Sequence, residues 1–66
     1  MNEEIDTTQL SVKYIRETEM AFLLAFEDED WEEHWVPKSV VEDSSFGDDG
    51  GEVDIRDWWL ETKGII

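Results

Sequence analysis

The stretch that decides the fold is Gln9–Phe26, which reads QLSVKYIRETEMAFLLAF. Its first half alternates, because Leu10, Val12 and Tyr14 fall on one side of an extended chain and polar residues separate them. β-Branched and aromatic residues favour strands, and a period of two is the pattern of a half-buried strand. We therefore predict a strand over residues 9–16.

The second half, Met20–Phe26, is apolar on both faces. A central strand explains it, with the core side formed by Met20, Phe22, Leu24 and Phe26. A helix is the competing interpretation, since Ala, Leu and Met favour helices. The run is short and lies between polar breaks, so we favour the strand.

Further elements follow from turn and breaker residues. An acidic turn at 27–30 precedes a strand over 31–36, which Pro37 ends because proline lacks an N–H for the ladder. Residues 38–42 fit a single helical turn that lays Val40 or Val41 against the core. Ser, Asp and Gly dominate 43–51, which predicts a loop, and 52–56 alternates as another strand.

The C-terminal segment carries helix boundary signals. Asp57 suits the N-cap of a helix over 58–63. Gly64 suits the left-handed C′ position, where Ile65 and Leu60 pack together in a Schellman ending. The fold class is therefore α+β, a small antiparallel sheet of three to four strands with a short C-terminal helix. Residues 1–8 are expected to form a flexible N-terminal leader and 9–66 a single domain.

Composition narrows the function classes. The chain has 66 residues, no cysteine, 19 Asp and Glu against five Lys and Arg, and a net charge of −14 at pH 7. The acidic N-terminus lacks the basic start of a secretory signal, and the longest apolar run has seven residues. We expect a cytoplasmic protein that binds neither nucleic acid nor membrane directly, since both are anionic.

Enzyme function is not expected. His34 is the only histidine, and no nucleophile or second base is placed around it. We predict no cofactor; the acidic segment 48–52 leaves weak divalent-cation binding as an alternative. Most of the four tryptophans are expected in the core, with Trp31 or Trp58 exposed as an anchor for a partner.

Carboxylates gather in two tracts, which we take as candidate partner-binding residues. A duplex carries one phosphate charge per about 1.7 Å of axis, and a domain of this length has a diameter of roughly 28 Å, so the charge per unit length resembles that of DNA. Alternate side chains on a strand lie about 6.6 to 7 Å apart, similar to successive phosphates; a solvated hairpin turn is the simpler interpretation. The candidates are Asp28, Glu29, Asp30, Glu32 and Glu33 in the first tract, and Glu42, Asp43, Asp48, Asp49, Glu52 and Asp54 in the second.

One stretch resembles a group of small phage and prophage proteins. The likeness covers roughly residues 21–64, and its most specific part is Trp35-Val36-Pro37-Lys38-Ser39, with a W-L-x-x-K-G ending at 59–64. In acidity and size the chain is also similar to phage anti-CRISPR proteins that mimic DNA. These resemblances imply phage provenance and carry over no individual functional residue.

Together these observations predict an acidic DNA-mimic inhibitor. Its partner would be a cationic DNA-binding protein, with a CRISPR–Cas surveillance complex as the leading target. A restriction enzyme, repair nuclease or histone-like protein is the alternative target, and a non-inhibitory accessory phage domain is the alternative class. We expect a monomer rather than a homodimer, because copies of this charge repel each other.

Overall fold

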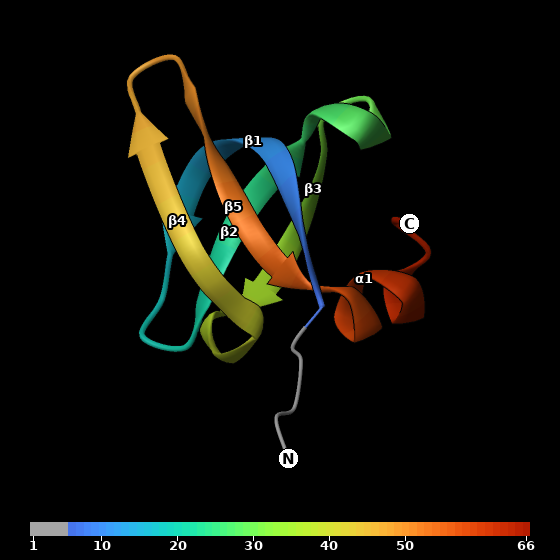
Figure 1. Cartoon of the computed structure of the whole chain (residues 1–66). Helices are drawn as coiled ribbons and strands as arrows, with labels where there is room; N and C mark the ends of the chain where they lie inside the picture. Colours follow the sequence, from blue (N-terminus) through green and yellow to red (C-terminus); the bar gives the residue numbers. More distant parts are fainter. Residues whose placement is uncertain (1–5) are drawn as a thin grey trace.

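The computed structural model describes residues 6–66, which form one antiparallel sheet and one helix (Figure 1). The α+β class with a short C-terminal helix is confirmed. The elements are β1 (Thr7–Glu17), β2 (Ala21–Phe26), η1 (Glu27–Glu29), β3 (Glu32–Pro37), η2 (Lys38–Val40), β4 (Val41–Gly47), β5 (Gly50–Arg56) and α1 (Asp57–Lys63), where η marks a 3₁₀ turn.

The sheet has five strands in the order β3-β2-β1-β5-β4, so the prediction of three to four strands was too low. The error lies in the segment predicted as a loop, which forms β4, a tight turn at Asp48–Asp49 and the start of β5. Gly47 pairs with Gly50 across that turn. β4 is an edge strand that turns mostly polar side chains to solvent, so its composition resembles that of a loop.

The long strand β1 belongs to both halves of the sheet. Its residues 7–12 pair with β5, and its residues 12–17 pair with β2. Val12 lies at the junction, opposite Phe26 on one side and Gly51 on the other. β1 is strongly curved along its length (Figure 1), and its pairing with β2 has a bulge at Ile15.

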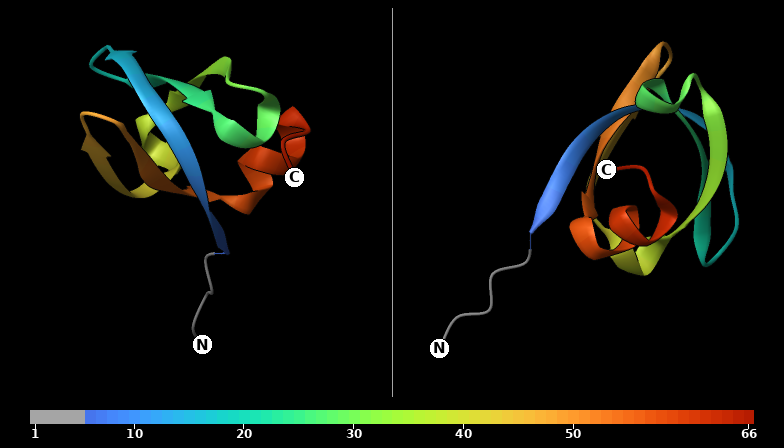
Figure 2. Two further views of the ribbon diagram at one scale, coloured as in Figure 1. Left: turned by 90° about the horizontal axis from the view of Figure 1, so that it is seen from above. Right: turned by 90° about the vertical axis from the view of Figure 1, so that its right-hand side faces the viewer.

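The bend curls the sheet until distant strands meet. Phe22 on β2 and Phe46 on β4 have ring centroids 5.3 Å apart, although β1 and β5 lie between their strands in the sheet. Tyr14 completes the cluster, 6.3 Å from the first ring and 5.2 Å from the second. Figure 2 shows the resulting curl from two further directions.

The core fills the inside of the curl. The predicted inward positions Leu24 and Phe26 are fully buried, and Val40 in η2 is also buried, as expected. Met20 was wrongly assigned to the core: it is 76% exposed, because β2 begins only at Ala21 after a turn closed by Thr18. The core comprises Leu10, Val12, Leu24, Phe26, Val36, Val40, Val53, Ile55, Trp59 and Leu60.

The helix ends as predicted and begins differently. Gly64 is left-handed, and the Ile65 amide donates to the Leu60 carbonyl over 2.9 Å, which is the Schellman pattern. Asp57 is not the N-cap but the first helical residue. Its carboxylate accepts a 2.6 Å hydrogen bond from the Thr8 hydroxyl, which ties the helix to β1.

The leader prediction falls partly outside the described residues, which begin at Asp6. Thr7 and Thr8, assigned to that leader, belong to β1. The radius of gyration is 11.6 Å, close to the value expected for a compact chain of this length. Within the described residues, no helix is long and apolar enough to cross a membrane.

The β4–β5 pairing predicts different costs for two glycine substitutions. A Cβ on Gly51 would lie 2.3 Å from the Ser45 carbonyl oxygen, so Gly51→Ala should force the hairpin apart and cost about 2–3 kcal/mol of unfolding free energy. A Cβ on Gly64 meets nothing within 4 Å, so Gly64→Ala should cost only the left-handed backbone penalty of about 1 kcal/mol. Urea denaturation measures both; an equal or smaller loss for Gly51→Ala would contradict the strand pairing.

Candidate functional site

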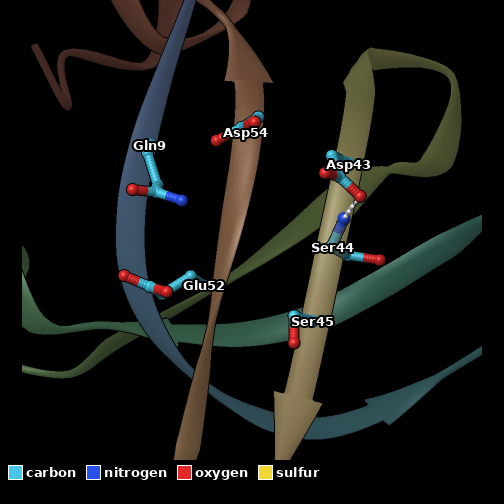
Figure 3. Close-up of a pocket in the computed structure, with 6 residues that line it drawn as sticks. All are labelled: Gln9, Asp43, Ser44, Ser45, Glu52 and Asp54. Atoms are coloured by element: carbon cyan, nitrogen blue, oxygen red, sulfur yellow. Dashed lines mark hydrogen bonds between the residues drawn. The ribbon is translucent and has the colours of Figure 1, made fainter.

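Carboxylates gather on the outer face of β4 and β5. Asp54 pairs with Gln9 of β1 on one side and with Asp43 of β4 on the other, and Glu52 lies one cross-strand row away, opposite Ser45. Figure 3 shows these side chains around a shallow hollow of about 50 Å³. We call Asp43, Glu52 and Asp54, together with Asp48 and Asp49 of the adjoining turn, the acidic surface.

The acidic surface has no internal charge compensation. Among residues 6–66, the Lys and Arg ion pairs join Lys38 to Glu17 and Arg56 to Glu42, and neither involves Asp43 or its neighbours in this surface. Asp43 and Asp54 occupy directly opposite positions, where like charges destabilise a sheet. Glu42, a predicted site residue, is the exception in its tract, since Arg56 neutralises it at the β4 bulge.

The first acidic tract does not form the expected row of carboxylates on one strand face. Asp28 and Glu29 lie in the 3₁₀ turn η1, and Asp30 is its left-handed cap, with a φ of 55°. The strand starts only at Glu32, which pairs opposite the inward-facing Phe26. Glu33 falls on the outer face, opposite Ala25. The acidic turn predicted at 27–30 is therefore confirmed, the phosphate-like row along one strand face is not formed, and the partner-binding role of this tract stays a prediction.

The bend in β1 sets where the two acidic turns lie. η1 follows Phe26 directly, and the Asp48–Asp49 turn precedes Gly50–Gly51, so both adjoin the partners of Val12. Both turns lie at the end of the molecule away from the described start of the chain, on either side of the bend (Figures 1 and 2). The fold thus brings acidic segments about 20 residues apart in sequence to the same end.

Two cations of β1 lie over tryptophan rings on the other half of the sheet. The Lys13 ammonium is 5.7 Å from the centroid of Trp31, and the Arg16 guanidinium carbon is 5.4 Å from that of Trp35. These pairs occupy the outer face of β1, β2 and β3. Leu23 of β2 pairs with Arg16 on one side and with Trp35 on the other. Its side chain is only 9% exposed, although it does not belong to the main core.

We call Lys13, Arg16, Trp31 and Trp35 the aromatic surface. Trp31 is 51% exposed and Trp35 43% exposed, while Trp58 on α1 is also exposed. Only Trp59 of the four tryptophans is buried, so the expectation that most of them fill the core was wrong. Both predicted candidates for exposure, Trp31 and Trp58, are exposed.

Trp31 has a strained backbone conformation that a hydrogen bond to Phe26 supports. Its φ is 64°, directly after the left-handed Asp30, and its amide donates to the Phe26 carbonyl over 2.8 Å. A bulky residue in this region costs roughly 1–2 kcal/mol. The sequence gives no sign of this conformation, because left-handed turns are usually marked by Gly or Asn.

A second, mainly apolar hollow of about 300 Å³ adjoins the aromatic surface. Met20, Trp35 and Pro37 line it, and Lys38 lies at its edge, bound to Glu17. Hydrogen bonds donated by Lys38 and by the Tyr14 hydroxyl lower the pKa of Glu17, and the same carboxylate raises the pKa of Tyr14.

The one histidine is part of the packing. His34 lies edge-on to Phe26 at 5.5 Å between ring centroids, and its Nε2 is 3.4 Å from a Glu32 oxygen. Among residues 6–66, no trio of His, Asp or Glu side chains is arranged to hold a metal ion. The arrangement offers binding surfaces, one anionic and one aromatic.

Comparison of the chain with protein-family models, with curated proteins and with solved structures finds no match. The candidate functions therefore rest on the two surfaces.

Neutralising one member of the opposed acidic pair should stabilise the fold. Asp54→Asn removes the repulsion with Asp43 and keeps the side-chain shape, so we expect unfolding free energy to rise by about 0.5 kcal/mol at low salt and by almost nothing at 1 M salt. Glu19→Gln, in the exposed turn between β1 and β2, is the matched control, with the same charge change and no carboxylate opposed to it in a strand pair. A loss of stability in Asp54→Asn would show that Asp54 has a stabilising partner.

The Glu17 network predicts an acid-side change in stability. The folded pKa of Glu17 lies below its ordinary value, so its contribution is present above the unfolded pKa and is lost as pH falls through the folded pKa. Thermal melts of wild type and Glu17→Gln should therefore differ at pH 6 and converge towards pH 3. A difference that stays constant with pH would mean that the carboxylate charge has no role.

Proposed function

We propose that the chain is an inhibitor that occupies the DNA-binding groove of a cationic protein, with its carboxylates in place of DNA phosphates. The observation that carries this proposal is the uncompensated acidic surface. Asp43, Glu52 and Asp54 are fixed on paired strands and take part in none of the ion pairs of the described residues; Arg56, the nearest cation along β5, pairs with Glu42 instead. A fixed anionic surface loses little conformational entropy when Arg or Lys side chains bind it.

The total charge alone is a weaker argument. The molecule extends 40 × 23 × 18 Å, and 40 Å of duplex carries about 24 phosphate charges, against a net −14 here. The likeness to DNA is therefore local. It resides in the acidic surface and in the turn η1: the Asp48–Asp49 turn and η1 lie at one end of the curled sheet, and Asp43 and Asp54 lie further along β4 and β5 towards the other end.

The target we propose is the DNA-recognition surface of a CRISPR–Cas surveillance complex in the host cytoplasm. The resemblance to small phage proteins and the acidity shared with DNA-mimic anti-CRISPR proteins support this choice. The mechanism needs no chemistry: carboxylates pair with the Arg and Lys side chains that normally hold phosphates, and target DNA is excluded. Association should be steered by charge and slow steeply with salt.

Competition with DNA tests the proposal. Purified surveillance complex is mixed with labelled target duplex and increasing amounts of the chain, at 50 and 300 mM salt. We expect displacement of the duplex, with markedly weaker inhibition at the higher salt. Absence of displacement from any surveillance complex would rule out this target. If the chain captures another DNA-binding protein and duplex DNA releases it, mimicry holds with a different target; capture that DNA does not reverse would contradict mimicry.

The acidic surface should carry the affinity. The triple variant Asp43→Asn, Glu52→Gln, Asp54→Asn should weaken inhibition by about 100-fold, equivalent to about 2.7 kcal/mol. The matched control neutralises Asp6, Glu19 and Glu61, three exposed acids outside β4 and β5, and changes the net charge equally. Equal loss in both variants would mean that total charge, rather than this surface, drives binding. A third variant, with Asp28, Glu29 and Asp30 neutralised, measures the share of η1.

A further inference from the structure

The outer edge of β4 is a strand edge without a partner strand. β5 pairs with β4 on one side, and β4 ends the sheet on the other (Figure 3). Among residues 6–66, the backbone hydrogen bonds made outside helices and strand ladders involve no residue of β4. Residues 42–45 are all exposed. The N–H and C=O groups along this edge are therefore available to pair with another strand.

The Ser44 amide marks the backbone groups that face this edge. It donates a 2.9 Å hydrogen bond to the carboxylate of Asp43, the preceding residue of the same strand. Residues of an antiparallel strand alternate between those that bond to the paired neighbour and those that point away from it. Phe46 therefore faces the same edge as Ser44. A strand that pairs here takes over the Ser44 N–H and releases the Asp43 carboxylate for a cation.

The side chains beside this edge favour a basic strand. Asp43 and Ser45 alternate along the outer face of β4, and Asp54 and Glu52 continue the same two cross-strand rows on β5. Natural proteins often protect an edge strand with lysine or proline, and β4 contains neither. Its carboxylates repel the same edge of a second copy and attract cations, since like charges destabilise a strand pair and opposite charges stabilise it.

The other edge of the sheet is less suited to pairing. β3 ends at Pro37, which has no N–H to donate. Its outer side chain Trp35 lies under the Arg16 guanidinium, 5.4 Å from the ring centroid. The two edges of the sheet therefore differ, and β4 combines unpaired backbone groups with uncompensated negative charge.

From these observations we propose that β4 binds an extended basic segment of the partner by antiparallel strand addition. The inference rests on the proposed function, since it names the part of the cationic partner that contacts the acidic surface. Main-chain hydrogen bonds hold the added strand, and its alternate side chains select the sequence, as in other cases of strand addition. The segment that fits is basic, apolar, basic at successive positions.

The register of β4 and β5 explains that sequence. Adjacent strands lie about 4.8 Å apart, so a basic side chain opposite Asp43 is within ion-pair reach of it and relieves its repulsion with Asp54. The second basic side chain lies opposite Ser45. Because Ser45 is small, a long arginine side chain reaches across it towards Glu52 on the next strand.

The middle residue of the segment points to the inner face. It lies opposite Ser44 and diagonal to Phe46, whose ring centroid is 5.2 Å from that of the partly exposed Tyr14. Diagonal neighbours on a sheet face are within reach of aromatic side chains. An apolar side chain at this position therefore extends the ring cluster.

A synthetic peptide tests the site without the whole partner. The probe is blocked at both ends and alternates three arginines with two valines between terminal glycines. Titration into the isotope-labelled full chain should shift the amide signals of residues 43–46 most. A control peptide of the same composition, with its arginines consecutive, should bind about tenfold more weakly, because alternation places every cation on the outer face. Equal binding of the two peptides would overturn the proposal.

Backbone methylation separates strand pairing from simple charge attraction. In the antiparallel arrangement the valine N–H groups face β4 and the arginine N–H groups face away. Methylation of the valine nitrogens should therefore abolish binding, while methylation of the arginine nitrogens should leave the affinity within about threefold. Equal effects of the two modifications would show that charge alone holds the peptide, and would overturn the proposal.

A proline on the edge tests the same pairing from the side of the chain. Ser44→Pro removes the outward N–H, and proline is tolerated at edge positions of this kind. We expect it to abolish peptide binding, whereas the matched control Ser44→Ala, which keeps the N–H, should bind as wild type does. Far-UV circular dichroism checks folding. Equal binding by the two folded variants would overturn the proposal; if Ser44→Pro does not fold, the methylated peptides decide.

The peptide and DNA experiments can fail separately. Displacement of DNA by a chain that does not bind the alternating peptide would overturn strand addition and leave the inhibitory function standing. Binding of the peptide at residues 43–46, with no DNA-binding protein displaced from its duplex, would contradict the inhibitory function and support the strand site.

Discussion

The pairing of one strand with two partners governs the rest of this structure. Residues 7–12 of β1 pair with β5 on one side, and residues 12–17 pair with β2 on the other. Val12 is the one residue that pairs with both strands. Because the two neighbours of β1 pair with different lengths of this strand, the two halves of the sheet are offset along it, and the curled sheet encloses a core that α1 helps to close (Figures 1 and 2). The same junction brings the acidic turns at residues 27–30 and 48–49 to one end of the molecule. Architecture and charge distribution therefore have a common origin.

The curl also separates two kinds of surface. The outer face of β4 and β5 carries unpaired carboxylates, and the outer face of β1, β2 and β3 carries tryptophans covered by Lys13 and Arg16. Placing those cations beside Asp43 and Asp54 instead would relieve repulsion within the sheet. Their position over aromatic rings leaves the acidic surface free, at a cost in stability that a small domain tolerates poorly. Such a cost is consistent with a surface selected for binding, and the strained backbone of Trp31 on the other face fits the same view.

Periodic and capping signals predicted much of this fold. The alternation of Leu10 and Val12, the buried run ending at Phe26 and the glycine ending at Gly64 all appear where the local pattern places them. The failures have specific physical causes. β4 is a polar edge strand, so its composition resembles that of a loop. The Asp57 carboxylate accepts a hydrogen bond from Thr8 and does not cap the start of the helix.

Long-range placement was beyond local patterns. Counting acids located the two tracts, and local signals predicted the turn at 27–30, but of the two interpretations of the first tract the row along one strand face is not formed. The opposition of Asp43 and Asp54 depends on a β4–β5 register that composition does not reveal. Trp31 follows a left-handed turn that contains no glycine, and Trp35 is contacted by Arg16, two strands away, so no local pattern reveals either arrangement.

The most direct measurement is a nuclear Overhauser spectrum of the isotope-labelled chain, examined at Val12. The central claim is that this residue joins both halves of the sheet and so fixes the positions of the acidic turns. The account predicts cross-strand contacts from the Val12 backbone to both Phe26 and Gly51 in one set of signals, with contacts between the Asp43 and Asp54 backbones in the same spectrum. Contacts from Val12 to only one of the two neighbours would contradict it.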